Sequence, residues 1–88
     1  MFIQTEKTPN PNTIKFIPGE DVLVNKTANF INVEQAKKSP LATSIFEING
    51  VEAIFLGSDF ISVTKSENTD WDLVKTEILT TIMDHYVS

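Results

Sequence analysis

The single histidine is the first side chain of this sequence to consider for chemistry. His85 lies between Asp84 and Tyr86 near the end of a predicted helix, where the helix dipole favours a cation. A proton relay or a metal site needs partners in a defined geometry, and no His–carboxylate metal spacing occurs along the chain. We therefore interpret His85 as a surface residue and predict no metal ligands.

Carboxylates and serines are the remaining candidates for catalysis. Glu47, Glu52 and Asp59 would approach one another if a hairpin folded over the end of the preceding helix, and paired carboxylates can carry out acid–base chemistry or bind cations. Solvated surface charge is the commoner role of such residues. The serines lack a nucleophile-elbow context, and Ser39 fits better as a helix cap. We predict no catalytic residues and a protein that is not an enzyme.

Cysteine is absent from the whole sequence. Disulfides, thiolate metal sites, cysteine ligation of iron–sulfur clusters and cysteine nucleophiles are therefore excluded within this chain. Any metal centre nearby would take its thiolates from another segment or another molecule. We expect no cofactor to be bound by these 88 residues.

Length and charge narrow the class of protein further. A length of 88 residues, 41% of them hydrophobic and 22% charged, predicts a single globular domain over residues 1–88. Seven lysines, no arginine and a net charge of −5 disfavour nucleic acid as a partner. No secretory signal and no apolar run near the roughly 20 residues of a membrane span is present, so we expect no membrane partner and a cytoplasmic setting.

The most distinctive local pattern is the run Thr8-Pro9-Asn10-Pro11-Asn12-Thr13, which we call the proline loop. Each proline restricts its own φ and favours an extended residue before it, while asparagine side chains can bond to nearby backbone groups. The pattern predicts a shaped turn between two strands. A structural turn is the favoured interpretation, and recognition of a partner is the second.

Alternation, helix caps and turn residues predict the elements that surround this loop. The predicted strands are residues 2–7, 13–17, 51–56 and 60–65, with residues 22–24 and 27–31 as edge strands or loop. The first predicted helix is a short turn over residues 33–38 capped by Asn32 with Gln35, and the second starts at Pro40 after the cap Ser39 and ends at Asn49-Gly50. The last predicted helix is capped by Thr69 or Asp70. Its apolar stripe is Trp71, Val74, Ile78, Ile82 and Tyr86, widened by Leu79 and Met83.

This order predicts an α+β fold. In the sequence ββ-α-ββ-α, the simplest closure is a two-layer α/β sandwich with a mainly antiparallel sheet and the helices on one face. Residues 51–56 are apolar on both sides, which favours a central position in the sheet. Gly57, Ser58 and Asp59 form the predicted hairpin loop.

Several blocks together resemble the N-terminal domain of the Nfu (NifU-like) family of iron–sulfur cluster scaffold and carrier proteins. They are residues 1–5 with 8–16, residues 39–42 with 45–46, residues 50–65, and residues 70–71 with 82–85. The resemblance covers essentially the whole chain in order. It implies a domain that precedes a NifU-like domain with a Cys-x-x-Cys pair, through which two such domains bridge a [4Fe-4S] cluster.

The resemblance implies a supporting role, because the chain stops at Ser88 before any cysteine. We expect either a piece of a longer carrier or a stand-alone version of the domain, which acts as a non-catalytic accessory domain in [4Fe-4S] cluster assembly and delivery. The implied partners are the iron–sulfur assembly machinery, apo-protein clients and a NifU-like C-terminal domain of its own. The implied setting is the bacterial cytoplasm, or the mitochondrial matrix for a mature eukaryotic protein.

For a partner-binding surface, we predict the proline loop, with Pro9, Asn10, Pro11 and Asn12, and a neighbouring hairpin around Asp59. A rigid, polar, exposed loop suits recognition without chemistry, and replacing Asn10 and Asn12 by alanine should weaken binding with stability nearly unchanged. The alternative is a self-associating structural or regulatory domain, without a direct role in cluster transfer, that buries the open face of the sheet.

Overall fold

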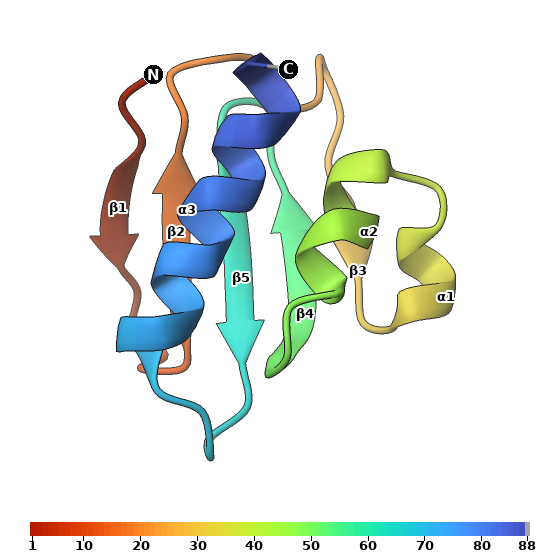
Figure 1. The fold of residues 1–88 in the computed structure, drawn as a ribbon. Helices are drawn as coiled ribbons and strands as arrows, with labels where there is room; N and C mark the ends of the chain where they lie inside the picture. The colour runs from red at the N-terminus through yellow and green to blue at the C-terminus, as the bar shows by residue number, and fades with distance from the viewer. Residues whose placement is uncertain (88) are drawn as a thin grey trace.

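Five antiparallel strands form one sheet in the computed structural model, which describes residues 1–87 (Figure 1). The strands lie in the order β1-β2-β5-β4-β3. Their bounds are β1 Gln4–Lys7, β2 Thr13–Ile17, β3 Ala28–Phe30, β4 Val51–Leu56 and β5 Ile61–Lys65. The helices are α1 Val33–Ala36, α2 Pro40–Phe46 and α3 Trp71–Val87. The predicted α+β class is confirmed.

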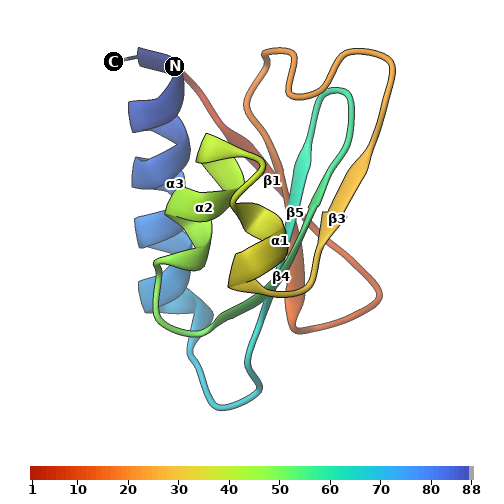
Figure 2. The same ribbon diagram turned by 90° about the vertical axis from the view of Figure 1, so that its right-hand side faces the viewer.

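All three helices lie on one face of the sheet, as predicted (Figure 2). α2 begins where Ser39 caps it, because the Ser39 hydroxyl oxygen accepts a hydrogen bond from the Ala42 backbone N–H at 3.2 Å. α3 begins after Asp70, whose carboxylate accepts one from the Asp72 backbone N–H at 3.0 Å. The capping patterns in the sequence therefore predicted the first residues of α2 and α3 correctly.

The hydrophobic core lies between the sheet and these helices. β5 is the central strand, and Ile61 and Val63 on it are fully buried. α3 places Val74, Ile78 and Ile82 against them, a spacing of four residues that keeps one helix face toward the sheet. The other core members are Phe16, Phe30, Ala36, Leu41, Ala42, Ile45, Ile54 and Leu56.

The region between β2 and α2 differs most from the predicted ββ-α-ββ-α order. Residues 22–24 form no strand, whereas Ala28–Phe30 pairs with β4 as the edge strand β3. The short helix α1 follows it, so one strand and one helical turn are inserted before α2. β4 lies inside the sheet between β5 and β3, and β5 rather than β4 is the central strand. Pairing with β4 decides which β-prone piece becomes a strand.

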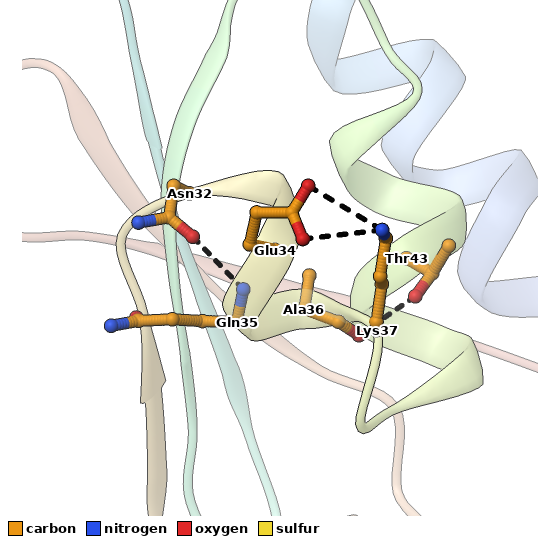
Figure 3. A network of polar contacts seen from close by, with 6 residues as sticks. All are labelled: Asn32, Glu34, Gln35, Ala36, Lys37 and Thr43. Carbon is orange, nitrogen blue, oxygen red and sulfur yellow. Dashed lines mark hydrogen bonds and ion pairs between the residues drawn. The ribbon is translucent and has the colours of Figure 1, made fainter.

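α1 and α2 are joined by a compact polar network (Figure 3). The Asn32 side chain accepts a hydrogen bond from the Gln35 backbone N–H at 2.9 Å, as the predicted cap requires. The Gln35 side-chain oxygen accepts from the backbone N–H of Ile31 rather than that of Asn32, so the reciprocal half of the capping box shifts by one residue. The Thr43 hydroxyl donates to the Ala36 carbonyl at 2.7 Å, which ties α2 to the end of α1.

Several predicted boundaries were wrong, since β1 starts at Gln4 rather than at residue 2 and α1 ends at Ala36 rather than at residue 38. α2 ends at Phe46 rather than at Asn49, and the loop between β4 and β5 contains Phe60 as well as the three predicted residues. On α3, Tyr86 is only partly buried. Helix ends and hairpin loops are set by pairing of the neighbouring backbone, which a side-chain pattern specifies loosely.

Gly50, in the turn between α2 and β4, has a positive φ of +102°, and a Cβ there would lie 2.7 Å from two Thr69 side-chain atoms. Gly19 also has a positive φ, +80°, but a Cβ there would meet no atom within 4 Å. We expect Gly19→Ala to cost about 1–2 kcal/mol through backbone strain alone, and Gly50→Ala to cost more because Thr69 must also move. Urea denaturation of both variants measures this. Equal losses would show that Thr69 moves without cost.

Candidate functional site

The proline loop is held by hydrogen bonds within itself. The Asn12 backbone N–H donates to the Asn10 side-chain oxygen at 2.9 Å, and the Thr13 N–H donates to the Asn10 carbonyl at 3.0 Å. The Thr8 hydroxyl lies 3.0 Å from the carbonyls of Asn10 and Thr13. Pro9, Asn10 and Pro11 are exposed, whereas Asn12 is half-buried. The predicted shaped turn is confirmed, and its recognition role stays a prediction.

A buried lysine anchors the loop to the centre of the sheet. Lys65 is only 7% exposed, and its ammonium donates to the Asn12 side-chain oxygen at 3.0 Å and to the Ser66 carbonyl at 3.2 Å. Its backbone N–H donates to the Asn12 carbonyl at 2.8 Å. A buried cation needs such partners, because burial removes its hydration. Asn12 therefore serves the fold as well as the surface.

Trp71 completes this contact from the start of α3. Its indole N–H donates to the Pro11 carbonyl at 2.9 Å, and its ring centroid lies 5.7 Å from the Lys65 ammonium nitrogen. A depression of about 340 Å³ lies beside it. The lining residues are Lys7, Thr8, Pro9, Asn10, Pro11, Thr13, Ile14 and Trp71. This end of the molecule offers a fixed, mixed polar and apolar surface.

Sequence reasoning missed Lys65 as part of this site and placed Trp71 only at the start of the last helix. A signal for Lys65 exists in the strand alternation. Residues 61, 63 and 65 of β5 share one face, and Ile61 and Val63 on that face are core residues. A lysine at an inward-facing position requires an oxygen partner, which the proline loop supplies.

The predicted neighbour of the loop, Asp59, lies at the other end of the sheet. In the β2–β5 register Thr13 is opposite Thr64 and Phe16 is opposite Ile61, so the proline loop flanks the end of β5 and Asp59 its start. Figure 1 shows the two turns at the bottom and the top of the sheet. The prediction that they form one surface was wrong. β2 and β5 are antiparallel, so the loop that precedes β2 and the turn that precedes β5 lie at opposite ends of the sheet.

Asp59 instead borders an acidic end of the molecule. It lines a depression of about 360 Å³ with Ile17, Gly19, Glu20 and Asp21. The Tyr86 hydroxyl donates to the Asp21 carbonyl at 3.0 Å, which joins the end of α3 to the β2–β3 loop. Burial, and secondly the charges of Glu20 and Asp21, raise the pKa of Tyr86, so its phenol stays protonated to higher pH than in the unfolded chain.

The carboxylates considered for catalysis do not converge. Glu52 lies at the start of β4, just after Glu47 at the end of α2, whereas Asp59 follows the far end of β4. His85 is exposed, and its ring packs edge-on against Tyr86 with centroids 5.0 Å apart. Residues 1–87 contain no group of three or more His, Asp or Glu side chains placed to hold a metal ion. The candidate catalytic side chains Glu47, Glu52, Asp59 and His85 therefore form no common site in the described residues.

The open face of the sheet is a second surface. Phe55 and Phe60 stack there with ring centroids 5.9 Å apart, and the Lys15 ammonium lies 4.4 Å from the Phe60 centroid. Lys15 also approaches Glu6 at 4.0 Å, so the two charges largely offset each other. Both phenylalanines are half-buried although no helix covers this face. Within the described part of the chain, no helix is both long and apolar enough to cross a bilayer.

Related sequences align with this chain over its whole length. It is 53% identical over 89 residues to the human protein named NFU1 iron-sulfur cluster scaffold homolog, mitochondrial, with 100% of this chain and 35% of that protein covered. It is 51% identical over 88 residues to NifU-like protein 4, mitochondrial, of Arabidopsis thaliana, with 100% of this chain and 31% of that protein covered. The chain thus spans about a third of the length of these relatives.

Solved structures share its fold. A NifU-like protein from Saccharomyces cerevisiae superposes with a TM-score of 0.82 at 30% identity, with 94% of this chain and 76% of that chain covered. Protein SAV1430 from Staphylococcus aureus superposes with a TM-score of 0.80 at 28% identity, with 93% of this chain and 99% of that chain covered. The solved SAV1430 chain therefore consists of this fold alone.

The family described as scaffold protein Nfu/NifU N terminal matches residues 3–88. That match spans all five strands and all three helices. The chain therefore belongs to the Nfu/NifU N-terminal family, as its sequence blocks predicted.

Proposed function

We propose that this chain is a non-catalytic accessory domain in iron–sulfur cluster assembly, which supports delivery of [4Fe-4S] clusters to apo-proteins through protein–protein contacts. The observation that carries the proposal is a family of scaffold proteins combined with a sequence that contains no cysteine. Cysteine thiolates are the usual ligands of such clusters. The cluster is then cargo held by another domain, and this chain contributes shape and surface.

The partners we propose follow from this division of labour. They are the assembly machinery that supplies the cluster, the apo-proteins that receive it, and a NifU-like domain with a Cys-x-x-Cys pair where one is joined to this domain. The human and Arabidopsis relatives are named mitochondrial, which supports the mitochondrial matrix for a eukaryotic member. The fold also occurs in Staphylococcus aureus, which supports the bacterial cytoplasm as the other setting.

Self-association is the second candidate function. It is favoured by the half-buried Phe55 and Phe60, which lie on a sheet face that no helix covers. In this alternative two copies bury that face and the chain has no direct part in cluster transfer. Sedimentation of the chain at micromolar concentration tests this alternative. A stable dimer would support self-association, and a monomer would contradict it.

Cluster transfer in vitro tests the main proposal. A NifU-like cysteine domain loaded with a [4Fe-4S] cluster is mixed with an apo-enzyme that needs one, and recovery of enzyme activity is followed. We expect the cysteine domain fused to this chain to transfer several-fold faster at limiting client, because a second contact raises the local concentration of client. A fusion to an unrelated acidic domain of similar size is the control.

Two results would contradict the proposal. One is the same transfer rate for the fusion, the control fusion and the cysteine domain alone. The other is an isolated chain that retains iron and sulfide in stoichiometric amounts, since its own side chains would then hold the cargo. Iron and sulfide analysis of the purified chain measures the second directly.

A further inference from the structure

We propose that a cleft between the β2–β3 loop and the α1–α2 turn docks a short acidic segment of a partner protein that also carries apolar side chains. We call it the basic cleft. Its residues are Val22, Leu23, Lys26, Thr27, Ala28, Phe30, Lys38, Ser39, Pro40, Leu41, Leu56 and His85. It lies apart from the proline loop, with which it shares no lining residue.

The basic cleft consists of two adjoining depressions of about 250 and 280 Å³. Both are lined by Leu23, Lys38, Ser39 and Leu56, so they form one continuous surface. Leu41 and Leu56 are buried, 4% and 1% exposed, and belong to the core, which makes this part of the lining rigid. Apolar groups that enter the cleft therefore contact the core directly.

The charge at the cleft is positive in a protein that is negative overall. Lys26 and Lys38 are exposed, and among residues 1–87 neither forms an ion pair. The adjacent Lys37 differs, because its ammonium lies 3.2 Å from the Glu34 carboxylate (Figure 3). With a net charge of −5 for the chain, two uncompensated lysines at one apolar cleft favour a carboxylate-bearing ligand over a cationic one.

The dimensions favour a peptide segment over other anions. Each depression is smaller than the roughly 300–1,000 Å³ of small-molecule pockets. Two adjoining depressions of this size can each accept one side chain of a bound peptide. A polyanion such as nucleic acid needs many cations, and the net charge of the chain repels it.

This inference rests on the proposed function only in naming a docking surface for its partner contacts. Its test uses the isolated chain and no cluster, so its failure would leave the transfer experiment unaffected. The isolated chain is suitable, because its described residues share one hydrophobic core and the solved SAV1430 chain consists of the same fold alone.

Phage display of random dodecapeptides on the immobilised chain tests the inference. We expect enriched peptides to carry Asp or Glu beside Leu, Ile or Phe, and a synthetic copy of the best one to shift backbone NMR signals of residues 22–28, 38–41 and 56. The double variant Lys26→Gln/Lys38→Gln should bind this peptide about fivefold to tenfold more weakly, because two exposed ion pairs are lost.

The matched control is Lys15→Gln/Lys75→Gln, which makes the same change in net charge at residues that line neither the basic cleft nor the depression beside the proline loop. Its affinity for the peptide should stay within twofold of the parent chain. The inference is overturned if no peptide is enriched, if the enriched peptides are basic or lack acidic residues, or if both double variants bind equally. Signal shifts confined to the proline loop would likewise overturn it, and would point to that loop as the docking surface.

Discussion

Phe16→Ala is expected to lower the free energy of unfolding by about 3–5 kcal/mol. Phe16 is 0% exposed and lies between Thr5 of β1 and Ile61 of β5 in the sheet register. Its removal leaves a cavity between the sheet and α3. The cavity persists because β2 is held by hydrogen bonds to β1 and β5 on both sides. Because small domains are stable by only about 5–15 kcal/mol, much of the population would unfold at moderate urea. Urea denaturation followed by circular dichroism measures the change.

Phe55→Ala is the matched control for this prediction. It removes the same side chain from the open face of the sheet, where Phe55 is half-buried and stacks on Phe60. We expect a clearly smaller loss, since no closed cavity forms and an aromatic pair contributes only about 0.5–1.5 kcal/mol beyond its buried area. Equal losses for the two variants would mean that the open face is also covered, as in a dimer.

Asn12→Ala is expected to lower the free energy of unfolding by about 1.5–3 kcal/mol, the usual range for a hydrogen bond to a charged group. The Asn12 side-chain oxygen is one of two hydrogen-bond acceptors of the Lys65 ammonium, at 3.0 Å, and Lys65 is 7% exposed. Without it, one donor of a buried cation loses its partner. The urea midpoint of the variant, compared with that of the parent chain, measures the effect.

Asn10→Ala and a double variant serve as controls. Asn10 is exposed and its side-chain oxygen accepts one backbone hydrogen bond, so a loss of about 0.5–1.5 kcal/mol is expected. Removing both members of the buried contact, in Asn12→Ala/Lys65→Met, should cost less than the sum of the single changes, because no buried charge remains. Full additivity would show that Lys65 does not depend on Asn12.

The contact between Asn12 and Lys65 gives part of the proline loop a structural role. The sequence alone predicted nearly unchanged stability when both Asn10 and Asn12 are replaced by alanine. Because the Asn12 side chain accepts a hydrogen bond from the buried Lys65 ammonium, we now expect a loss of stability at Asn12. Recognition, which stays a prediction, is better tested at Pro9 and Asn10, which are exposed and lie away from Lys65 in the hydrogen-bond pattern. A loss of binding for Pro9 or Asn10 variants, with no more than the small loss of stability expected for Asn10→Ala, would separate the two roles.

Local sequence signals predicted most of the secondary structure. Ser39 before Pro40, Asn32 before Gln35 and Asp70 before Trp71 all act at helix starts, because capping involves neighbours three or fewer residues apart. The spacing of Val74, Ile78 and Ile82 predicted the buried face of α3. The candidate site was predicted less well, since the proline loop was found but Lys65 and the distance to Asp59 were not.

Elements without a strong local signal needed the fold to decide them. Residues 22–24 are Val, Leu and Val and have a higher β-propensity than Ala28, Asn29 and Phe30, yet only the second segment pairs with β4. Asp59 was assigned to the end of the sheet that holds the proline loop, because strand order was not available from the sequence. β-Propensity describes a residue that suits a half-buried strand, while pairing and register depend on distant partners.

By itself, the sequence of this protein determined its family, its α+β class, its helix starts and the absence of cysteine ligands, because these depend on residue identity and on neighbours within a few positions. Only the tertiary structure decided that Lys65 and Trp71 join the proline loop across 53 and 60 residues of sequence. It also decided that Lys26 and Lys38 share one cleft. Long-range contacts of this kind form when the sheet closes under the helices, and no local pattern encodes which distant residues then meet.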